Sequence, residues 1–126
     1  MENVKKMNFN ERFRDQSKQL ALKVIMLYSQ LKSREELRIL GKQLIRSGTS
    51  VAANFRAAVR ARSSAEYYSI MCIVVEECDE TLFWLELIDS TGFIKSPKIQ
   101  ELMKKTAGLL AVFAKTRKAI KERYLK

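Results

Sequence analysis

The densest group of chemically active side chains in this sequence is a run of carboxylates at Glu76, Glu77, Asp79 and Glu80. Carboxylates spaced i, i+3 and i+4 share one face of a helix and could hold Mg²⁺ or Mn²⁺. Helical enzymes of this kind need a second acidic pair on a facing helix, and the preceding segment offers only Glu35 and Glu36, at its start. The chain also has no histidine, the commonest catalytic base and metal ligand. We therefore expect no metal, no cofactor and no enzymatic activity.

A second set of chemically active side chains is basic. The chain has 24 Lys+Arg against 14 Asp+Glu, a formal net charge of +10. Near its end, basic residues fall on the helical face opposite Leu110 and Phe113: Lys98, Lys104, Lys105, Lys115, Lys118, Arg123 and Lys126. Such a face can meet phosphates, and no aromatic platform or base-reading motif accompanies it. It predicts nucleic-acid binding with little sequence specificity; the alternative is a solubilising exterior on a scaffold for an unidentified protein partner.

Helices must position these residues, and the sequence marks where they begin and end. The expected starts are Asn8 with Glu11, the S-x-x-E capping boxes at Ser33 and Ser63, and Ser96 before Pro97; Gly92 is an expected end. Helices are predicted near 8–31, 34–61, 64–91 and 97–124, each with apolar residues at helical spacing. Short connections make neighbours antiparallel. The predicted fold is all-α, a single-domain up-down-up-down four-helix bundle over residues 1–126.

The second predicted helix contains the unusual run Ser47-Gly48-Thr49-Ser50. Glycine costs a helix interior about 1 kcal/mol relative to alanine, so its presence needs a reason. Close packing of two helix backbones is one explanation, and a kink with Asn54 bonding a freed carbonyl is the other.

The third predicted helix has two apolar sides. Residues 63–92 contain seven acids and no Lys or Arg, and their second apolar side interleaves Ile73, Phe83, Trp84 and Leu87 with the carboxylates. A solvated face does not normally carry such side chains, so this face predicts a subunit contact, with cover by a loop as the alternative. The expected cations for these acids are Arg56, Arg60, Arg62 and Arg117. They would pair at that contact, or form ordinary surface ion pairs.

Other features concern the compartment. The first twenty residues are polar and no apolar run reaches the length of a membrane span, so we expect a cytoplasmic protein that does not enter membranes. Cys72 and Cys78 lie six residues apart on one predicted helix, too far apart for a disulfide.

Two stretches resemble the signatures of a known family, namely QLIRSGTSVAANFRAAVRARS (43–63) and IVVEECDETLFWLEL (73–87). They are similar to the bacterial four-helix-bundle proteins encoded in intervening sequences of 23S ribosomal RNA genes. The resemblance implies a cytoplasmic bundle that assembles as a ring-like homopentamer. A similar pentamer is the nucleic-acid-binding accessory subunit of diversity-generating retroelements. Together with the basic charge, the family resemblance favours a nucleic-acid ligand, RNA over DNA. Two positions depart from the pattern: Gly48 replaces a more usual alanine, and Val75 a frequent acid.

Overall fold

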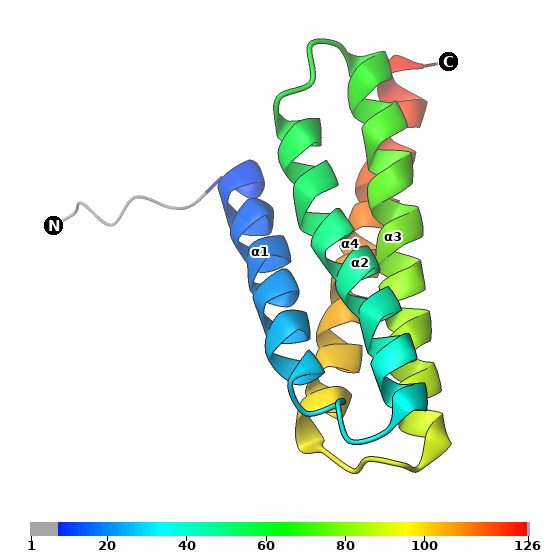
Figure 1. Cartoon of the computed structure of the whole chain (residues 1–126). Helices are drawn as coiled ribbons and strands as arrows, with labels where there is room; N and C mark the ends of the chain where they lie inside the picture. The colour runs from blue at the N-terminus through cyan, green and yellow to red at the C-terminus, as the bar shows by residue number, and fades with distance from the viewer. Residues whose placement is uncertain (1–7, 126) are drawn as a thin grey trace, which may run out of the picture.

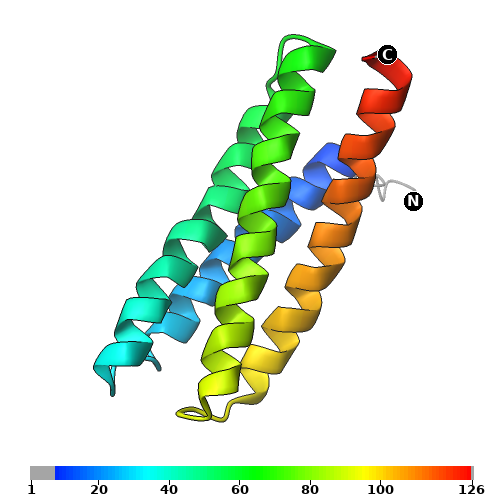
Figure 2. The ribbon, with the colours of Figure 1, turned by 90° about the vertical axis from the view of Figure 1, so that its right-hand side faces the viewer.

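The computed structural model describes residues 8–125, which form four long helices in succession (Figure 1). They are α1 (Phe9–Tyr28), α2 (Glu35–Val59), α3 (Ser64–Thr91) and α4 (Pro97–Tyr124), and no strand occurs in this part of the chain. The helices run alternately up and down, which confirms the predicted all-α bundle. In a view along another direction, α3 lies in front between α2 and α4, with α1 behind (Figure 2). Since α1 packs only on α2 and α4, α1 and α3 are diagonal partners.

Most of the predicted helix ends are confirmed. Asn8 Oδ1 accepts from the Glu11 amide at 2.9 Å, and Ser63 Oγ accepts from the Glu66 amide at 3.1 Å. Ser96 caps α4 and Pro97 follows it, as expected. Gly92 ends α3 in the left-handed region, with a φ of 69°, a conformation that side chains with a Cβ adopt at a cost.

The connection between α1 and α2 differs from the prediction. Helix α1 ends at Tyr28, not near residue 31, because the chain tightens into i−3 turns that bring Leu31 into the core. Helix α2 begins at Glu35, one residue later than a capping box at Ser33 requires, so the Ser33 side chain does not cap the helix. Arg34 takes the N-cap position, and its guanidinium lies 3.7 Å from the centre of the Phe93 ring.

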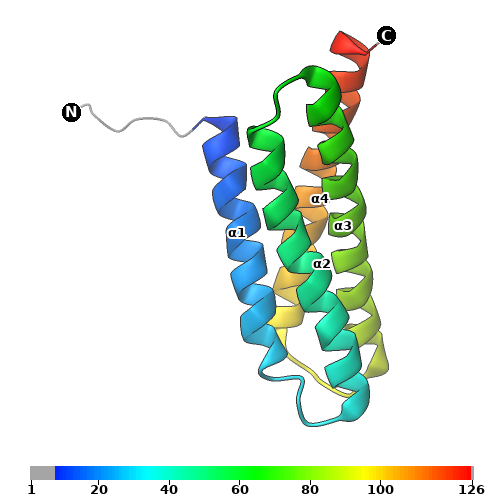
Figure 3. The same cartoon turned by 45° about the horizontal axis from the view of Figure 1, so that its top comes forward.

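The core is a continuous apolar column with aromatic rings toward one end. The Phe55 and Phe113 rings stack at 5.2 Å between centroids, and Phe13 meets Phe113 edge-on at 6.0 Å. The buried face of α4 is broader than a single line of residues at helical spacing such as Ile99, Thr106 and Phe113, because Leu102 and Leu109 are also buried. Helix α4 contacts both α1 and α3, so a wider arc of its surface is covered. Phe9 at the start of α1 and Tyr124 at the end of α4 are exposed; Figure 3 shows α3 and α4 extending past the start of α1.

The glycine run of α2 is a point of close helix packing. Helix α2 is continuous from Glu35 to Val59, and a Cβ on Gly48 would lie 3.1 Å from Val24 Cγ2 of α1. Beside it, the buried Thr81 hydroxyl of α3 donates to Ser47 Oγ at 3.0 Å. Asn54 Nδ2 donates to the Ser50 carbonyl at 2.9 Å without breaking the helix. Close packing, not a kink, therefore explains the run.

Candidate functional surfaces

The outward side of α3 carries apolar side chains among carboxylates, as the sequence predicted. Ile73, Phe83 and Leu87 are exposed to 42%, 50% and 37%. The Trp84 indole is partly exposed, packs edge-on to Phe83 at 5.0 Å, and donates to Glu80 Oε2 at 3.0 Å. We call this surface the α3 strip, made up of Ile73, Glu76, Glu80, Phe83, Trp84 and Leu87. No loop covers it in the part of the chain that the structure describes.

An arginine that the sequence analysis did not select pairs with the acids of α3. Arg46 of α2 lies 3.2 Å from Glu77 Oε1 and also forms an ion pair with Glu80. On a helical wheel Arg46 flanks the core stripe, next to Ser47. This position would have identified Arg46 as a partner of the acids only if α3 had been known to pack on that side of α2.

The four arginines selected from the sequence are placed differently. Arg62 pairs with Glu66 in the first turn of α3 at 3.6 Å, a solvent-exposed i,i+4 pair. Arg56 and Arg60 are exposed and line a hollow on the α1 side of α2, away from α3. Arg117 is partly exposed, and among residues 8–125 it forms no ion pair. Within one chain these four side chains do not meet Glu76, Glu77, Asp79 or Glu80; their pairing across a subunit contact stays a prediction.

The basic face predicted for α4 lies in solvent. Its described members are all exposed, and none forms an ion pair within residues 8–125: Lys98, Lys104, Lys105, Lys115, Lys118 and Arg123. The seventh predicted member, Lys126, lies outside the described residues. The structure divides the set, because the first three lie beside α1 and the others lie further along α4, toward its end.

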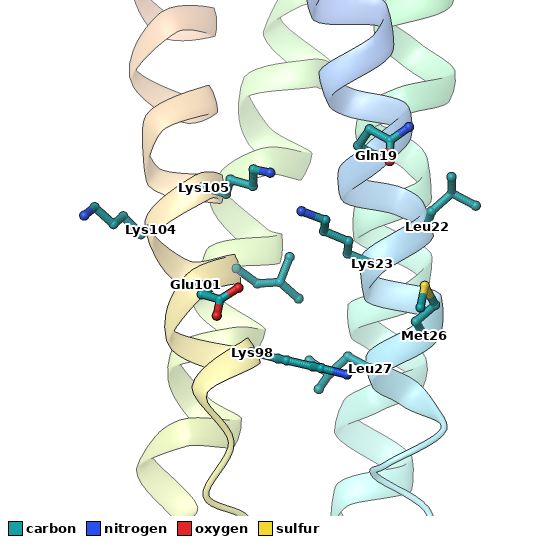
Figure 4. A pocket seen from close by; sticks show the side chains of 10 residues that line it. Gln19, Leu22, Lys23, Met26, Leu27, Lys98, Glu101, Lys104 and Lys105 are labelled. Carbon is teal, nitrogen blue, oxygen red and sulfur yellow. The ribbon is translucent and has the colours of Figure 1, made fainter.

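The first three lysines border a groove that the sequence did not predict. Helices α1 and α4 contact each other less closely than the other neighbouring pairs, leaving a groove of about 730 Å³ between them (Figure 4). Apolar side chains line it: Leu22, Met26, Leu27 and Leu102. The remaining lining residues are polar or charged: Gln19, Lys23, Lys98, Glu101, Lys104 and Lys105. We call it the α1/α4 groove.

Positive charge is concentrated across this groove. The ammonium groups of Lys23 and Lys105 point toward each other from the two helices (Figure 4). Lys23, through a side-chain hydrogen bond and its positive charge, lowers the pKa of Lys105, with slight burial acting the same way and Glu101 opposing it. An anion placed between the two ammonium groups would relieve their repulsion.

The described chain also contains two cysteines, one partly exposed and one buried. Cys72 and Cys78 are both free thiols, as expected from their spacing. Burial, with a smaller contribution from Asp79, raises the pKa of Cys78 to about 12, and its Sγ lies 3.6 Å from the Thr106 carbonyl oxygen.

Within residues 8–125 no three His, Cys, Asp or Glu side chains cluster as metal ligands would. None of the four helices is long and apolar enough to cross a membrane.

The fold and its surfaces define an antiparallel four-helix-bundle protein with a basic groove and an acidic, partly apolar helix face. The family model for 23S rRNA-intervening sequence proteins matches residues 10–115, and the chain belongs to this family. Among solved structures, it is similar to a protein of unknown function from the S23 ribosomal protein family of Bacteroides thetaiotaomicron. The two share 28% identity at a TM-score of 0.78, over 86% of this chain and 97% of the other. A comparison with curated proteins finds no match.

Proposed function

We propose that this protein is a non-enzymatic, oligomeric helical bundle that binds nucleic acid, RNA in preference to DNA, with little sequence specificity. The observation that carries the proposal is the row of exposed cations on α4 with no carboxylate partners in the described chain. A net charge of +10 per chain, multiplied by self-association, would strengthen attraction to phosphates. The description of the family, which refers to 23S rRNA, supports RNA as the ligand.

Self-association is the second part of the proposal. It is supported by the α3 strip, where exposed apolar side chains alternate with acids on a helix that has no basic residue. A pentamer is the assembly that the sequence resemblance implies. If the protein does not bind nucleic acid, this same strip favours the second candidate function, an oligomeric scaffold or accessory subunit for another protein.

The direct test measures binding of a structured RNA and of a DNA duplex by fluorescence anisotropy over a salt series. We expect both to bind at about 50 mM salt, RNA more tightly, and the affinity to fall by roughly a thousandfold or more at about 200 mM if six or more phosphates are contacted. A matched pair of variants locates the surface. In the first, Lys115, Lys118 and Arg123 are replaced by Glu; in the second, the exposed residues Lys32, Arg38 and Lys42 around the start of α2 are replaced by Glu.

Both triple variants change the net charge equally, so they separate a specific surface from overall attraction. We expect the α4 variant to bind far more weakly than the α2 variant and with a shallower salt dependence, because fewer counterions are released. Equal loss in both variants would refute assignment to α4. Failure of the unaltered protein to bind either nucleic acid at about 50 mM salt would exclude the nucleic-acid proposal and leave the scaffold function.

A further inference from the structure

Two exposed surfaces of this molecule are complementary in charge and in apolar character. The α3 strip belongs to a helix with seven acids and no Lys or Arg, and it exposes Phe83 and Leu87. The α1/α4 groove has four lysines and one glutamate in its lining, and it exposes Leu22 and Met26. An apolar surface with acids would therefore face an apolar surface with lysines.

The two surfaces cannot meet within one chain. Helix α3 lies diagonally across the bundle from α1, and its buried residues, such as Met71, Cys78 and Leu85, lie on the side opposite the strip. The strip therefore points away from the bundle, while the groove opens on another side, between α1 and α4. Only a second molecule can bring them together.

The groove is as long as the second half of the strip. The whole strip, from Ile73 to Leu87, rises about 21 Å along α3, and the groove lining on α4, from Lys98 to Lys105, rises about 10 Å, since each helical residue adds about 1.5 Å. The half from Glu80 to Leu87, which carries Phe83 and Trp84, therefore fits along the groove. A helix lying along the groove would place its apolar side chains against Leu22 and Met26. The Glu76 carboxylate would then lie near the facing ammonium groups of Lys23 and Lys105, which no acid separates in Figure 4, while Glu80 keeps its pairing with Arg46.

We propose that the α3 strip of one copy docks in the α1/α4 groove of the next copy, so that the protein assembles head to tail. This rests on the self-association proposed above and names the two surfaces that carry it. Because the surfaces differ, the contact is heterologous: repeated around an axis it closes a ring, and otherwise it continues as a filament. Lys115, Lys118 and Arg123 lie outside the contact and remain available to phosphate.

The experiment uses two variants of the full chain and their mixture, with masses measured by light scattering after gel filtration. The groove variant carries Lys23→Glu and Lys105→Glu, and the strip variant carries Glu76→Lys and Phe83→Lys; all four residues are exposed. Lys115→Glu with Lys118→Glu is the control, because it makes the same charge change as the groove variant at exposed positions outside the groove. Circular dichroism establishes that each variant is folded.

We expect the unaltered protein and the control to have several times the mass of 14.6 kDa, and each interface variant alone to run as a monomer. Mixing the two interface variants restores a higher mass, because the intact groove of one accepts the intact strip of the other. If the groove variant alone keeps the full mass, the contact does not use the groove, and the inference is wrong while self-association stands. If the mixture of folded variants stays monomeric, the pairing of strip with groove is equally excluded. A monomeric unaltered protein at tens of micromolar would instead overturn the proposed self-association itself.

Discussion

The close approach of α1 and α2 at Gly48 can be tested by adding a single methyl group. Three glycines lie inside helices, and two of them form a matched pair for this test. A Cβ on Gly108 of α4 would have no atom within 4 Å, whereas a Cβ on Gly48 would lie 3.1, 3.3 and 3.4 Å from Cγ2, Cγ1 and Cβ of Val24. Both substitutions to alanine gain the same helix propensity, so their difference isolates the packing.

The expected magnitudes follow from these distances. Gly108→Ala should raise the free energy of unfolding by about 1 kcal/mol, the difference in helix propensity between the two residues. At Gly48 the same gain opposes an overpacking cost of about 1–3 kcal/mol. Rotating Val24 away from the added methyl group is itself costly, because a β-branched residue on a helix has one strongly preferred rotamer. We therefore expect Gly48→Ala to lower the free energy of unfolding by about 0–2 kcal/mol.

Urea unfolding followed by circular dichroism measures both variants, at one protein concentration because self-association adds stability by mass action. The substitution Val24→Ala, made in both backgrounds, completes a double-mutant cycle. Once Val24 is shortened, Gly48→Ala should become as favourable as Gly108→Ala, with a coupling of about 1 kcal/mol or more. A Gly48→Ala variant that is as stable as Gly108→Ala without this change would refute close packing as the reason for the glycine.

Three further predictions concern individual residues of the core and of the helix ends. With Cys72 replaced by Ser, Cys78 should stay unreactive toward a thiol reagent until the protein unfolds. The pKa of Cys78 is raised from 9.0 to about 12 in the folded protein, so the unfolded state loses the thiol proton first. The free energy of unfolding should therefore fall as the pH rises above 9. Thr81→Val should lower the free energy of unfolding, measured in urea, by about 1 kcal/mol. The double variant with Ser47→Ala should lose less stability than the two single variants together, since both members of a buried hydrogen-bonded pair are then removed. Gly92→Ala should lower the unfolding free energy by about 1–2 kcal/mol because of its positive φ, and an equally stable variant would contradict that strain.

The fold could be predicted from the sequence because its signals are local. A cap such as Asn8 or Ser63 acts on amides three residues away, and a stripe of apolar residues repeats within a single helix. The errors occurred where a tertiary contact outweighed the local signal. Leu31 is drawn into the core after a shortened α1, and Arg34 packs on Phe93 where Ser33 was expected to cap.

The candidate surfaces were only partly predictable for the same reason. The exposed apolar residues of α3 and the basic face of α4 each lie on one helix, so helical periodicity identified them. The α1/α4 groove and the pairing of Arg46 with Glu77 each combine residues from two different helices. Periodicity assigns each residue to a side of its own helix, but only packing decides which helix it faces, because the neighbours of a helix are set by how the whole bundle closes.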